Sequence, residues 1–583
     1  MSEKTGSGRQ SDAAPLRSRN PALRATYAQK ALAQIPRLLG NQDRNPYSPT
    51  YGCFHRDYWL DKTSDFPDAV RQFGMHALAL VYSHDFPGSI YRGHPKIRDW
   101  AIAGLNFWAG IQHEDGSFDE FYPYERGWVG PTAFTTFTAI EAFKLLREEM
   151  PADVSERVLA AIRRAAFFIA AGESEEDHLA NHHAMACLAV WKSFELLGDP
   201  ELKRGFDALW RGFLGYHNAR EGWSREYDGV DPGYLSATVS FLGKVYQTNP
   251  DPAIFEVLRQ SAEFCAFFAY PNGFYAGSAG SRNTLHFYPH GFEILADRVP
   301  IAASVAEKML DGLSRGALVP PEIMSDRYVF YRVPEFLQAY LDYSETPSSM
   351  APLPSEQPPF TRFFPDSQIF IANTPQHYIV SNLAKGGVVK IFDRGSGRML
   401  VSDCGLLGRL ENGQVITSQW IGEDREVTLH EDGWEVRGRM QSVPATTLFT
   451  PLKNVIFRSV MMTLGRVPAL AHRIKGRIRK TLILGRRSVP VRFIRRLVLD
   501  GETVRIVDEL FLDSGSRFRS LSIGDEFFVR YVPQSRYFQP QELDVSGFVA
   551  DAGTISELNR SGHVRLGSRL AGGRLEREAT DGL

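Results

Sequence analysis

The chain has 583 residues, a formal net charge of -2 at pH 7, 43% hydrophobic residues and 23% charged residues. This length allows about two to four domains, and the near-average composition argues against both a disordered chain and a membrane-spanning protein. The balanced charge gives no general reason to expect binding to nucleic acid.

The first 25 residues predict a flexible N-terminus. Residues 1–20 are polar and contain no apolar stretch of the kind that a secretory signal requires. The sequence therefore predicts a cytoplasmic protein. No uncharged apolar run reaches the roughly 18 residues of a membrane-spanning helix.

The cysteines are widely scattered and show neither the C-x-x-C spacing of a metal site nor a disulfide framework. We therefore expect reduced thiols in the core and no disulfide bond. The four residues concerned are Cys53, Cys187, Cys265 and Cys404.

From residue 26 to residue 343 the apolar side chains recur at helical spacing. The clearest amphipathic stretches are 96–112, 155–172 and 252–269. This half of the chain is predicted to be all-α.

An internal repeat runs through this helical half. An outer helix is followed by a Gly-rich and aromatic loop, and then by a second helix that begins near Gly130, Ala180, Asp231 or Thr284. These starts lie about fifty residues apart, a period typical of helix pairs that bury their apolar faces against their neighbours. We expect the pairs to close into an incomplete (α/α) toroid.

The loops before these inner helices are rich in Tyr, His, Asn and Arg. In a toroid they lie on one rim, where their side chains gather into one cleft; the alternative is a set of surface turns spread around a solenoid. Their sequences are EDGSFDEFYPYERGWVGP, ESEEDHLANHHA, EGWSREYDGVDPGY and PNGFYAGSAGSRNTLHFYPHGF.

Residues 344–360 are rich in Pro and Ser and predict an interdomain linker. Short alternating runs follow, separated by Gly and Asp turns, and they predict an antiparallel β-sandwich over residues 361–570. Residues 571–583 form a C-terminal tail. The runs are QIFIAN, HYIVSN, GGVVKIFD, WEVRGRM, VRFIRRLVL and TVRIVDELFL.

Chemistry is concentrated at two successive inner-helix starts. Asn181, His182 and His183 stand at one start, and Tyr234 opens the next. An amide, an imidazole and a phenol suit proton abstraction beside a sugar carboxylate, which needs a donor to the carboxylate, a base, and an acid for the leaving oxygen. The phenol can act as a base only where its surroundings lower its pKa from about 10. Adjacent helical residues point about 100° apart, so only one of the two His side chains can face the cleft, and we favour His182.

By these residues and their spacing, the sequence resembles the helical-toroid polysaccharide lyases, namely the heparinase II/III-like and alginate-lyase-like families. The resemblance implies an incomplete (α/α) toroid joined to an antiparallel β-sheet domain. It also implies that Asn181 neutralises the substrate carboxylate and that His182 and Tyr234 provide acid/base catalysis, with His182 as the base on one stereochemical course and Tyr234 as either the base or the acid. Many such lyases are exported, and the absence of a secretion signal leaves room for polymer synthesis or intracellular turnover.

These families use a further His, for which His286, His290 and His377 are candidates. We assign His286 to catalysis and His290 to substrate binding. The two residues are spaced i, i+4, which predicts one helical face and would suit a metal if Glu293 joined them. Without further ligands in the sequence, no metal and no cofactor are predicted.

Four other residues are assigned to substrate binding. Arg282 can form a guanidinium fork to a carboxylate, or a structural ion pair. Tyr227 is a rival of Tyr234 for the phenol role. Tyr124 and His183 complete the set.

Several of these residues have a structural alternative. Asn181 can be a helix N-cap, and Tyr234 can be a core aromatic residue. Asp231 is expected to cap its helix, with Pro232 in the first turn.

The strongest charge asymmetry lies between Lys453 and Leu499, where 13 Lys or Arg and no Asp or Glu alternate with apolar residues. Residues 453–497 therefore predict peripheral contact with an anionic polymer or membrane, or else solvated edge strands whose Arg side chains face water. Nucleic acid is not expected, because no recognition motif accompanies the basic residues.

The function that these features favour is β-elimination of a uronic-acid-containing acidic polysaccharide. A uronosyl C5-epimerase would begin with the same proton abstraction. A glycoside hydrolase would use two of Glu120, Glu125 and Glu226, and a polysaccharide-binding protein of a biosynthetic cluster would use none.

Overall fold

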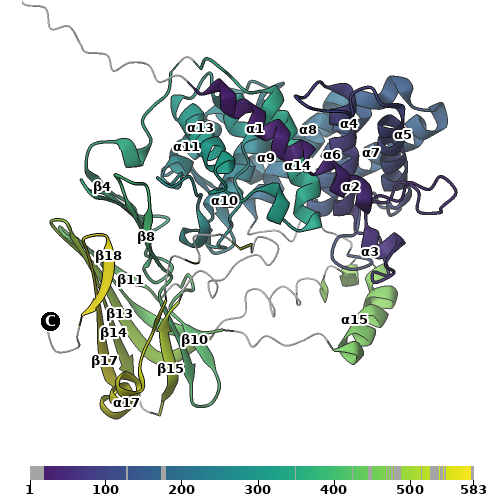
Figure 1. Ribbon diagram of the computed structural model, residues 1–583. Helices are drawn as coiled ribbons and strands as arrows, with labels where there is room; N and C mark the ends of the chain where they lie inside the picture. Colours follow the sequence, from purple (N-terminus) through teal and green to yellow (C-terminus); the bar gives the residue numbers. More distant parts are fainter. Residues whose placement is uncertain are drawn as a thin grey trace, which may run out of the picture.

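Inner helices close into a ring in the N-terminal half of the computed structural model, and Figure 1 shows this helical half above the sheets. The inner helices pack in the order α4, α6, α8, α10, α12 and α14, and α14 packs back against α4. The helical toroid expected from the repeat is therefore confirmed. The inner helices are α4 (Gly74–Ser83), α6 (Val129–Leu146), α8 (Ala180–Leu197), α10 (Pro232–Tyr246), α12 (His290–Leu295) and α14 (Asp326–Leu341).

The structure describes most of the chain. The described residues are 19–125, 129–172, 179–347, 349–422, 424–443, 450–467, 469–471, 473–474, 477, 487–513, 515–524, 537–538, 543 and 547–578.

An outer layer of helices covers the ring. These helices pack in the orders α5, α7, α9 and α11, α13, α1, and each buries one face only. Their bounds are α1 (Pro21–Leu32), α5 (Pro95–Gly110), α7 (Ala152–Ala170), α9 (Pro200–Leu214), α11 (Pro252–Ala266) and α13 (Pro300–Ser314), and two short helices, α2 (Ile35–Asn41) and α3 (Arg56–Trp59), lie near the N-terminus.

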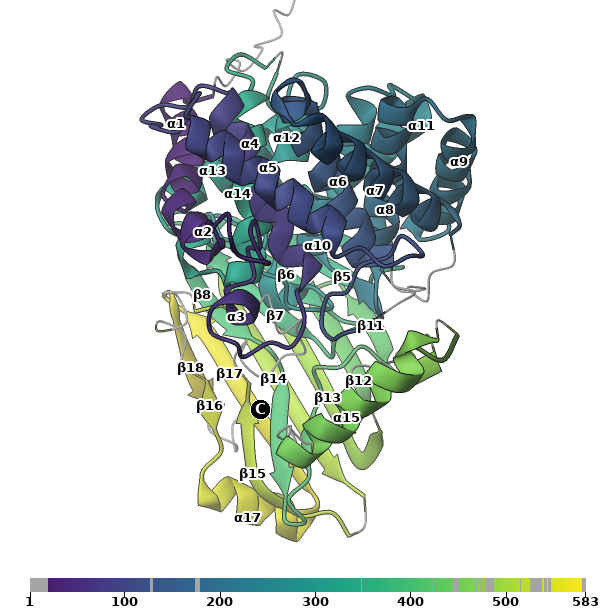
Figure 2. The ribbon, with the colours of Figure 1, turned by 90° about the vertical axis from the view of Figure 1, so that its right-hand side faces the viewer.

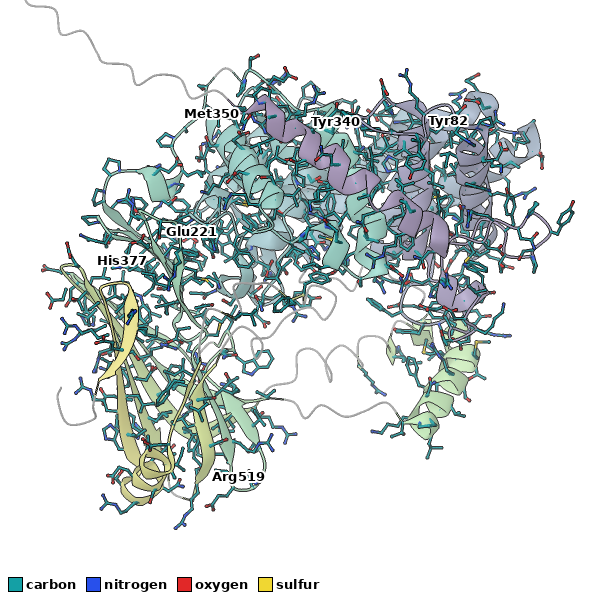
Figure 3. The ribbon with its side chains drawn as sticks, in the orientation of Figure 1. Tyr82, Glu221, Tyr340, Met350, His377 and Arg519 are labelled. Atoms are coloured by element: carbon teal, nitrogen blue, oxygen red, sulfur yellow. The ribbon has the colours of Figure 1, made fainter. Side chains whose placement is uncertain are left out.

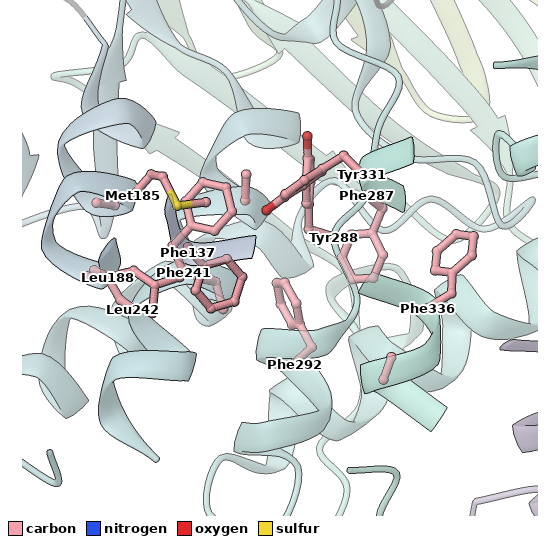
Figure 4. Close-up of a cluster of buried hydrophobic side chains, with 14 of the residues drawn as sticks. Phe137, Met185, Leu188, Phe241, Leu242, Phe287, Tyr288, Phe292, Tyr331 and Phe336 are labelled. Carbon is pink, nitrogen blue, oxygen red and sulfur yellow. The ribbon is translucent and has the colours of Figure 1, made fainter. Parts of the chain in front are cut away.

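The inner helices are buried on nearly all sides, and their aromatic and aliphatic side chains meet in the middle of the ring. Figure 4 shows Phe137 of α6 and Phe241 of α10 in this core, together with Tyr288 and Tyr331. Such a core explains why the helix pairs cannot fold singly, because each pair leaves an apolar face that only its neighbours cover.

The helix starts follow the predicted repeat at three of four positions. α6, α8 and α10 begin beside Gly130, Ala180 and Asp231, and Asp231 caps α10 through its side chain as expected. The fourth inner helix, α12, begins only at His290. His286 therefore lies in the preceding loop, and the prediction that His286 and His290 share one helical face is wrong.

A small antiparallel sheet interrupts the helical half, which was expected to be all-α. It contains β1 (His217–Asn218), β2 (Trp223–Glu226) and β3 (Gly229–Val230). Tyr227 adopts a positive φ of 58° at the turn between β2 and β3. The alternation of Trp, Ser, Arg and Glu before this turn is typical of a short hairpin strand.

The C-terminal half consists of two antiparallel sheets that share one apolar core, so the predicted β-sandwich is confirmed. The five-stranded sheet contains β4 (Phe360–Phe364), β5 (Ile369–Asn373), β6 (His377–Asn382), β7 (Val388–Asp393) and β8 (Met399–Asp403). The ten-stranded sheet contains β9 (Leu406–Leu410), β10 (Val415–Thr417), β11 (Glu426–His430), β12 (Gly433–Ser442), β13 (Ser488–Asp500), β14 (Thr503–Leu512), β15 (Phe518–Ile523), β16 (Phe548–Val549), β17 (His563–Ala571) and β18 (Arg574–Glu578).

The described part of this half also includes helices that the sequence did not predict. They are α15 (Pro451–Thr463), continued by the 3-10 turn η6 (Leu464–Arg466), and α17 (Ala552–Ser561). The predicted limits of the two domains, 26–343 and 361–570, stay a prediction.

The basic segment 453–497 is divided between α15 and β13. β13 lies between β12 and β14, and its Arg495 is fully buried and paired with Asp403 and Asp508. This arginine therefore belongs to the core of the sandwich. Residues 468, 472, 475–476 and 478–486 of the basic segment lie outside the described residues.

The turn after β6 joins the sandwich to the toroid. Lys385 Nζ donates hydrogen bonds to the carbonyl oxygens of Ser278 at 3.0 Å and Gly280 at 2.6 Å, and Asn382 Nδ2 donates to Ala279 O at 2.7 Å. Figure 2 shows β6 and β7 directly beneath the helical ring. The sheet half thus supports the loop that precedes α12.

A second junction involves Glu221, which Figure 3 labels between the two halves. Its carboxylate accepts hydrogen bonds from the backbone N–H groups of Asp366 at 2.6 Å and Ser367 at 3.0 Å.

No described helix has both the length and the hydropathy to cross a membrane.

All four cysteines are buried free thiols in the structure. Burial raises the pKa of Cys53 and of Cys265 to about 12, and that of Cys187 is also raised. We expect a thiol reagent at neutral pH to label the native protein only slowly, because a protonated thiol is a weaker nucleophile than a thiolate. Four thiols should react in denaturant without reductant, and a count of two or fewer there would show a disulfide.

Candidate functional site

Polar and aromatic side chains gather where α8 and α10 begin and where the loop before α12 passes them. We call this group the Tyr234 cluster. It consists of Asn181, Glu226, Tyr227, Tyr234, Arg282, His286 and Tyr328.

Asn181 lies at the N-terminus of α8 and is almost fully buried. Its backbone N–H and its Nδ2 both donate to Glu226 Oε1, at 2.6 Å and 2.9 Å. The N-cap position of α8 is occupied by Leu179, which provides no side-chain hydrogen bond. Glu226 thus accepts the hydrogen bond that an N-cap side chain would accept, and Asn181 is not the cap itself.

Burial raises the pKa of Glu226 to about 8, although the hydrogen bonds from Asn181 lower it. Its Oε2 has no hydrogen-bond partner among the described residues. Desolvation disfavours the charged form of a carboxyl group. Glu226 is therefore mostly protonated at neutral pH.

This protonation predicts a loss of stability as the pH rises. Because the pKa of Glu226 is higher in the folded protein than its ordinary value of 4.5, the folded state binds the extra proton between about pH 4.5 and about pH 8. The free energy of unfolding should fall across this window, by on the order of 1 kcal/mol or more. Urea denaturation of wild type and Glu226→Gln at several pH values measures the difference.

Glu148→Gln is the matched control, because the Glu148 side chain is 87% exposed. The free energy of unfolding should fall less with rising pH in Glu226→Gln than in the wild type. In Glu148→Gln it should fall as it does in the wild type. Parallel curves for wild type and Glu226→Gln would show that this carboxyl group does not titrate with a raised pKa.

Tyr234 is held in place by the start of α10. Asp231 Oδ1 accepts the Tyr234 backbone N–H at 3.1 Å, and Pro232 occupies the first turn. The Tyr234 side chain hydrogen-bonds that of Tyr328 on α14. Burial, followed by the nearby Tyr328 and Tyr227, raises the pKa of Tyr234 well above 10. The phenol is therefore protonated at neutral pH, so the lowered pKa that a base would need is not present.

His286 lies on the other side of Tyr328. The two rings are stacked with centroids 4.5 Å apart, and the ring of Tyr537 meets His286 edge-on at 5.4 Å. Burial, with a smaller effect of Arg332, lowers the pKa of His286 well below 6.5. Neither ring nitrogen has a hydrogen-bond partner among the described residues. His286 is therefore a neutral imidazole, the form that can accept a proton.

Arg282 supplies a positive charge to the same cluster. Its guanidinium lies over the Tyr227 ring, 3.9 Å from the centroid, and the residue is only 4% exposed. Nε and Nη1 have no hydrogen-bond partner among the described residues. A buried guanidinium with free donors favours an anionic group such as a carboxylate. The structural ion pair considered from the sequence is not seen in the described part of the chain.

The two adjacent histidines of α8 contact different elements, as their spacing predicted. The His182 ring meets Phe134 of α6 edge-on at 5.5 Å, and Phe134 in turn contacts Tyr331 of α14. The His183 ring stacks on Tyr216 at 4.5 Å. His182 therefore faces the inner helices, and His183 faces the segment that follows α9.

Three other predicted residues have partners away from the cluster. Tyr124 stacks against His113, with centroids 5.7 Å apart, and Arg466 lies over its ring. His290 Nε2 is paired with Asp342 Oδ2 at 2.5 Å. His377 is the first residue of β6 and lies in the sheet half (Figure 3).

The three glutamates considered for hydrolysis have different partners. Glu120 is paired with Arg327, and Glu125 accepts the backbone N–H of Phe121 at 2.7 Å. Only Glu226 belongs to the Tyr234 cluster. In the described part of the chain, no group of three or more His, Cys, Asp or Glu is arranged to hold a metal ion.

Sequence reasoning missed Tyr328, Arg332 and Tyr537. Tyr328 and Arg332 lie on α14, after the last aromatic loop, and Tyr537 belongs to the sheet half. The run DRYVFYRVPEF does carry a signal, because Tyr328 and Arg332 are spaced i, i+4 and so share one face of the helix. Arg332 is 1% exposed and lies over the Tyr288 ring at 4.2 Å.

At the level of sequence, no family profile and no curated protein matches the chain significantly. Among solved structures, the chain is similar to chondroitin AC lyase from Streptomyces coelicolor A3 in complex with chondroitin sulphate. The TM-score is 0.50 and the sequence identity 11%, and the match covers 89% of this chain and 69% of that chain.

Two weaker likenesses have TM-scores below 0.5. A heparinase III has a TM-score of 0.41 and 12% identity, covering 86% of this chain and 71% of its own. An unsaturated glucuronyl hydrolase specific for heparin has a TM-score of 0.39 and 11% identity, covering 56% and 98%. The likeness to chondroitin AC lyase is one of fold, and at that level it confirms the lyase-like architecture expected from the sequence.

Proposed function

We propose that the protein is a polysaccharide lyase that cleaves a uronic-acid-containing acidic polysaccharide by β-elimination. One observation carries the proposal. A neutral imidazole, His286, and a protonated phenol, Tyr234, both contact Tyr328, and the same cluster contains the Arg282 guanidinium, whose Nε and Nη1 have no hydrogen-bond partner among the described residues. This set contains a base, an acid and a group for the substrate carboxylate.

Arg282 and Asn181 would bind the uronate carboxylate. The negative charge that develops when the α-proton leaves is delocalised into this carboxylate, so donors placed there stabilise the transition state more than the ground state. Within the described part of the chain, the N–H groups of Arg282 Nε and Nη1 have no acceptor. Asn181 Nδ2 donates one hydrogen to Glu226, and an amide nitrogen carries a second hydrogen that would be donated to the substrate.

A histidine would remove the α-proton, and the C–H electron pair would form the carbon–carbon double bond. The glycosidic carbon–oxygen bond at the β-carbon would break, and Tyr234 would give its proton to the leaving oxygen. His286 suits the base role because burial keeps it neutral, and His182 is the alternative that the resemblance implies. Solvent would then restore both protonation states.

Glu226 favours one second candidate function, a glycoside hydrolase. A buried carboxyl group with a pKa of about 8 is protonated at neutral pH and can act as a general acid. Hydrolysis also needs a second carboxylate. Asp231 is a candidate because its charge raises the pKa of Glu226, but both of its oxygens accept backbone hydrogen bonds, from Tyr234 and Arg282.

The test is a set of uronic-acid polymers, such as alginate, hyaluronan and chondroitin sulphate, incubated with the purified full chain. Ultraviolet absorbance of an unsaturated uronide is the expected result. New reducing ends without that absorbance would indicate a hydrolase, and solvent deuterium in an uncleaved polymer would indicate the C5-epimerase. Binding without any of these products would indicate a polysaccharide-binding protein and would overturn the proposal.

A further inference from the structure

α15 and η6 expose a continuous set of aliphatic side chains, which we call the α15 face. Scattered exposed apolar residues are ordinary on protein surfaces, but a contiguous group marks an interaction site. Its members, with their exposed fractions, are Leu452 at 69%, Val455 at 63%, Ile456 at 55%, Met462 at 41%, Leu464 at 48% and Val467 at 49%.

The helical spacing explains why these residues share one side. Leu452, Val455 and Ile456 are separated by three and four residues, so they lie on one stripe of α15. Met462 continues the stripe near the end of the helix. The α15 face is therefore one side of the helix, and the residues on the opposite side make other contacts.

The opposite side of α15 is anchored to the toroid. The Phe457 ring meets Tyr122 edge-on at 5.2 Å, Arg458 is paired with Asp65 at 3.3 Å, and Met461 is fully buried. Figure 1 shows α15 apart from both sheets. The helix is thus held with the α15 face directed away from the residues that anchor it.

Positive charge surrounds this face. Lys453 and Arg466 are exposed at its two ends, and Arg473 is exposed shortly after it. The sequence from 453 to 474 contains four Lys or Arg and no Asp or Glu. A helix with an aliphatic face and basic flanks is typical of elements that lie in the interface of an anionic membrane.

We propose that α15 docks the protein on an anionic lipid bilayer, with the α15 face inserted at the boundary between headgroups and acyl chains. Aliphatic side chains offer no hydrogen bonds to sugar hydroxyls, and the face contains no aromatic ring on which a sugar could stack. If a second copy of the chain bound to this face, the basic segments of the two copies would lie opposite each other, and the repulsion between their like charges is unfavourable. This inference does not rest on the proposed function.

The test is sedimentation of the full chain with vesicles. One set contains phosphatidylcholine alone, and the other contains phosphatidylcholine with phosphatidylglycerol. We expect binding to the anionic vesicles and a loss of that binding in high salt. Val455→Glu/Ile456→Glu should weaken binding at least roughly tenfold, because two acyl-facing side chains become charged. Ile90→Glu is the matched control, since Ile90 is 79% exposed elsewhere, and it should bind like the wild type.

Lys453→Ser/Arg473→Ser should weaken anionic binding without changing the aliphatic face, which keeps the test informative if the double Glu variant folds poorly. The proposal is overturned if the wild type fails to bind anionic vesicles or if both double variants bind as the wild type does. It is also overturned if the α15 face variants lose self-association in light scattering, or lose binding to an acidic polysaccharide, while vesicles stay unbound. Turnover of a soluble polymer, measured on the same variants, reports separately on the proposed function.

Discussion

Tyr234→Phe is expected to lower kcat by roughly two to four orders of magnitude on the polymer that the wild type cleaves. The substitution keeps the ring and removes the hydroxyl that would protonate the leaving oxygen. Packing should survive, because the Tyr234 backbone N–H still donates to Asp231 and the ring still fills its place. The rate of unsaturated product formation is the measurement, with the urea midpoint as a check on folding.

Two further variants locate the effect. Tyr47→Phe removes a hydroxyl from a side chain that is 94% exposed, and it should turn over like the wild type. Tyr328→Phe removes the hydrogen-bond partner of Tyr234 but leaves the proposed acid, so its loss should be smaller. Full turnover by Tyr234→Phe would refute the assignment of the acid.

Asn181→Ala is expected to lower kcat by roughly two to three orders of magnitude, comparable to the loss of one oxyanion donor. It also removes the side-chain hydrogen bond to Glu226 Oε1, so the protein should lose about 1 kcal/mol of stability. Kinetics and urea denaturation of the same preparation separate the two effects.

The double variant Tyr234→Phe/Asn181→Ala tests whether the two groups serve one transition state. If they do, its loss of rate should be smaller than the product of the two single losses. Asn412→Ala, at an exposed turn, is the matched control for removing an amide. An Asn181→Ala enzyme with unchanged kcat and lowered stability would make Asn181 a structural residue only.

The architecture could be predicted because it repeats. Three inner helices begin where a period of about fifty residues placed them, and the strands β5 to β7 and β12 to β14 coincide with the alternating runs. The positive φ of Tyr227 at the turn of the hairpin interrupts the helical pattern there. Helical periodicity therefore could not predict the hairpin. The predicted start of the fourth inner helix was wrong for a related reason, since the chain before His290 is an irregular buried loop.

The candidate site could be predicted only in part. Asn181, Tyr234 and Arg282 come from loops whose composition marked them. Tyr537 comes from the other half of the chain and meets His286 only through the fold, so no local pattern could join the two. The pKa of Tyr234 was also beyond sequence reasoning, because its neighbours are other phenols and the guanidinium of Arg282 lies over Tyr227 instead.

The basic segment shows the same division between composition and structure. Its charge predicted a surface, and α15 fits that expectation. Arg495, however, lies in the core with Asp403 and Asp508. A count of charges does not show which strand becomes central, and the acidic partners of Arg495 lie outside the counted segment.

The contact of Tyr537 with the toroid bears on how the protein is synthesised. The ribosome completes the helical ring long before it reaches Tyr537, which follows Tyr328 by 209 residues in the numbering. At a rate of about 5–20 residues per second, this distance takes roughly 10–40 s. During that interval the nascent chain would carry His286 without the Tyr537 ring that meets it edge-on, so the ring would be folded before its site is finished.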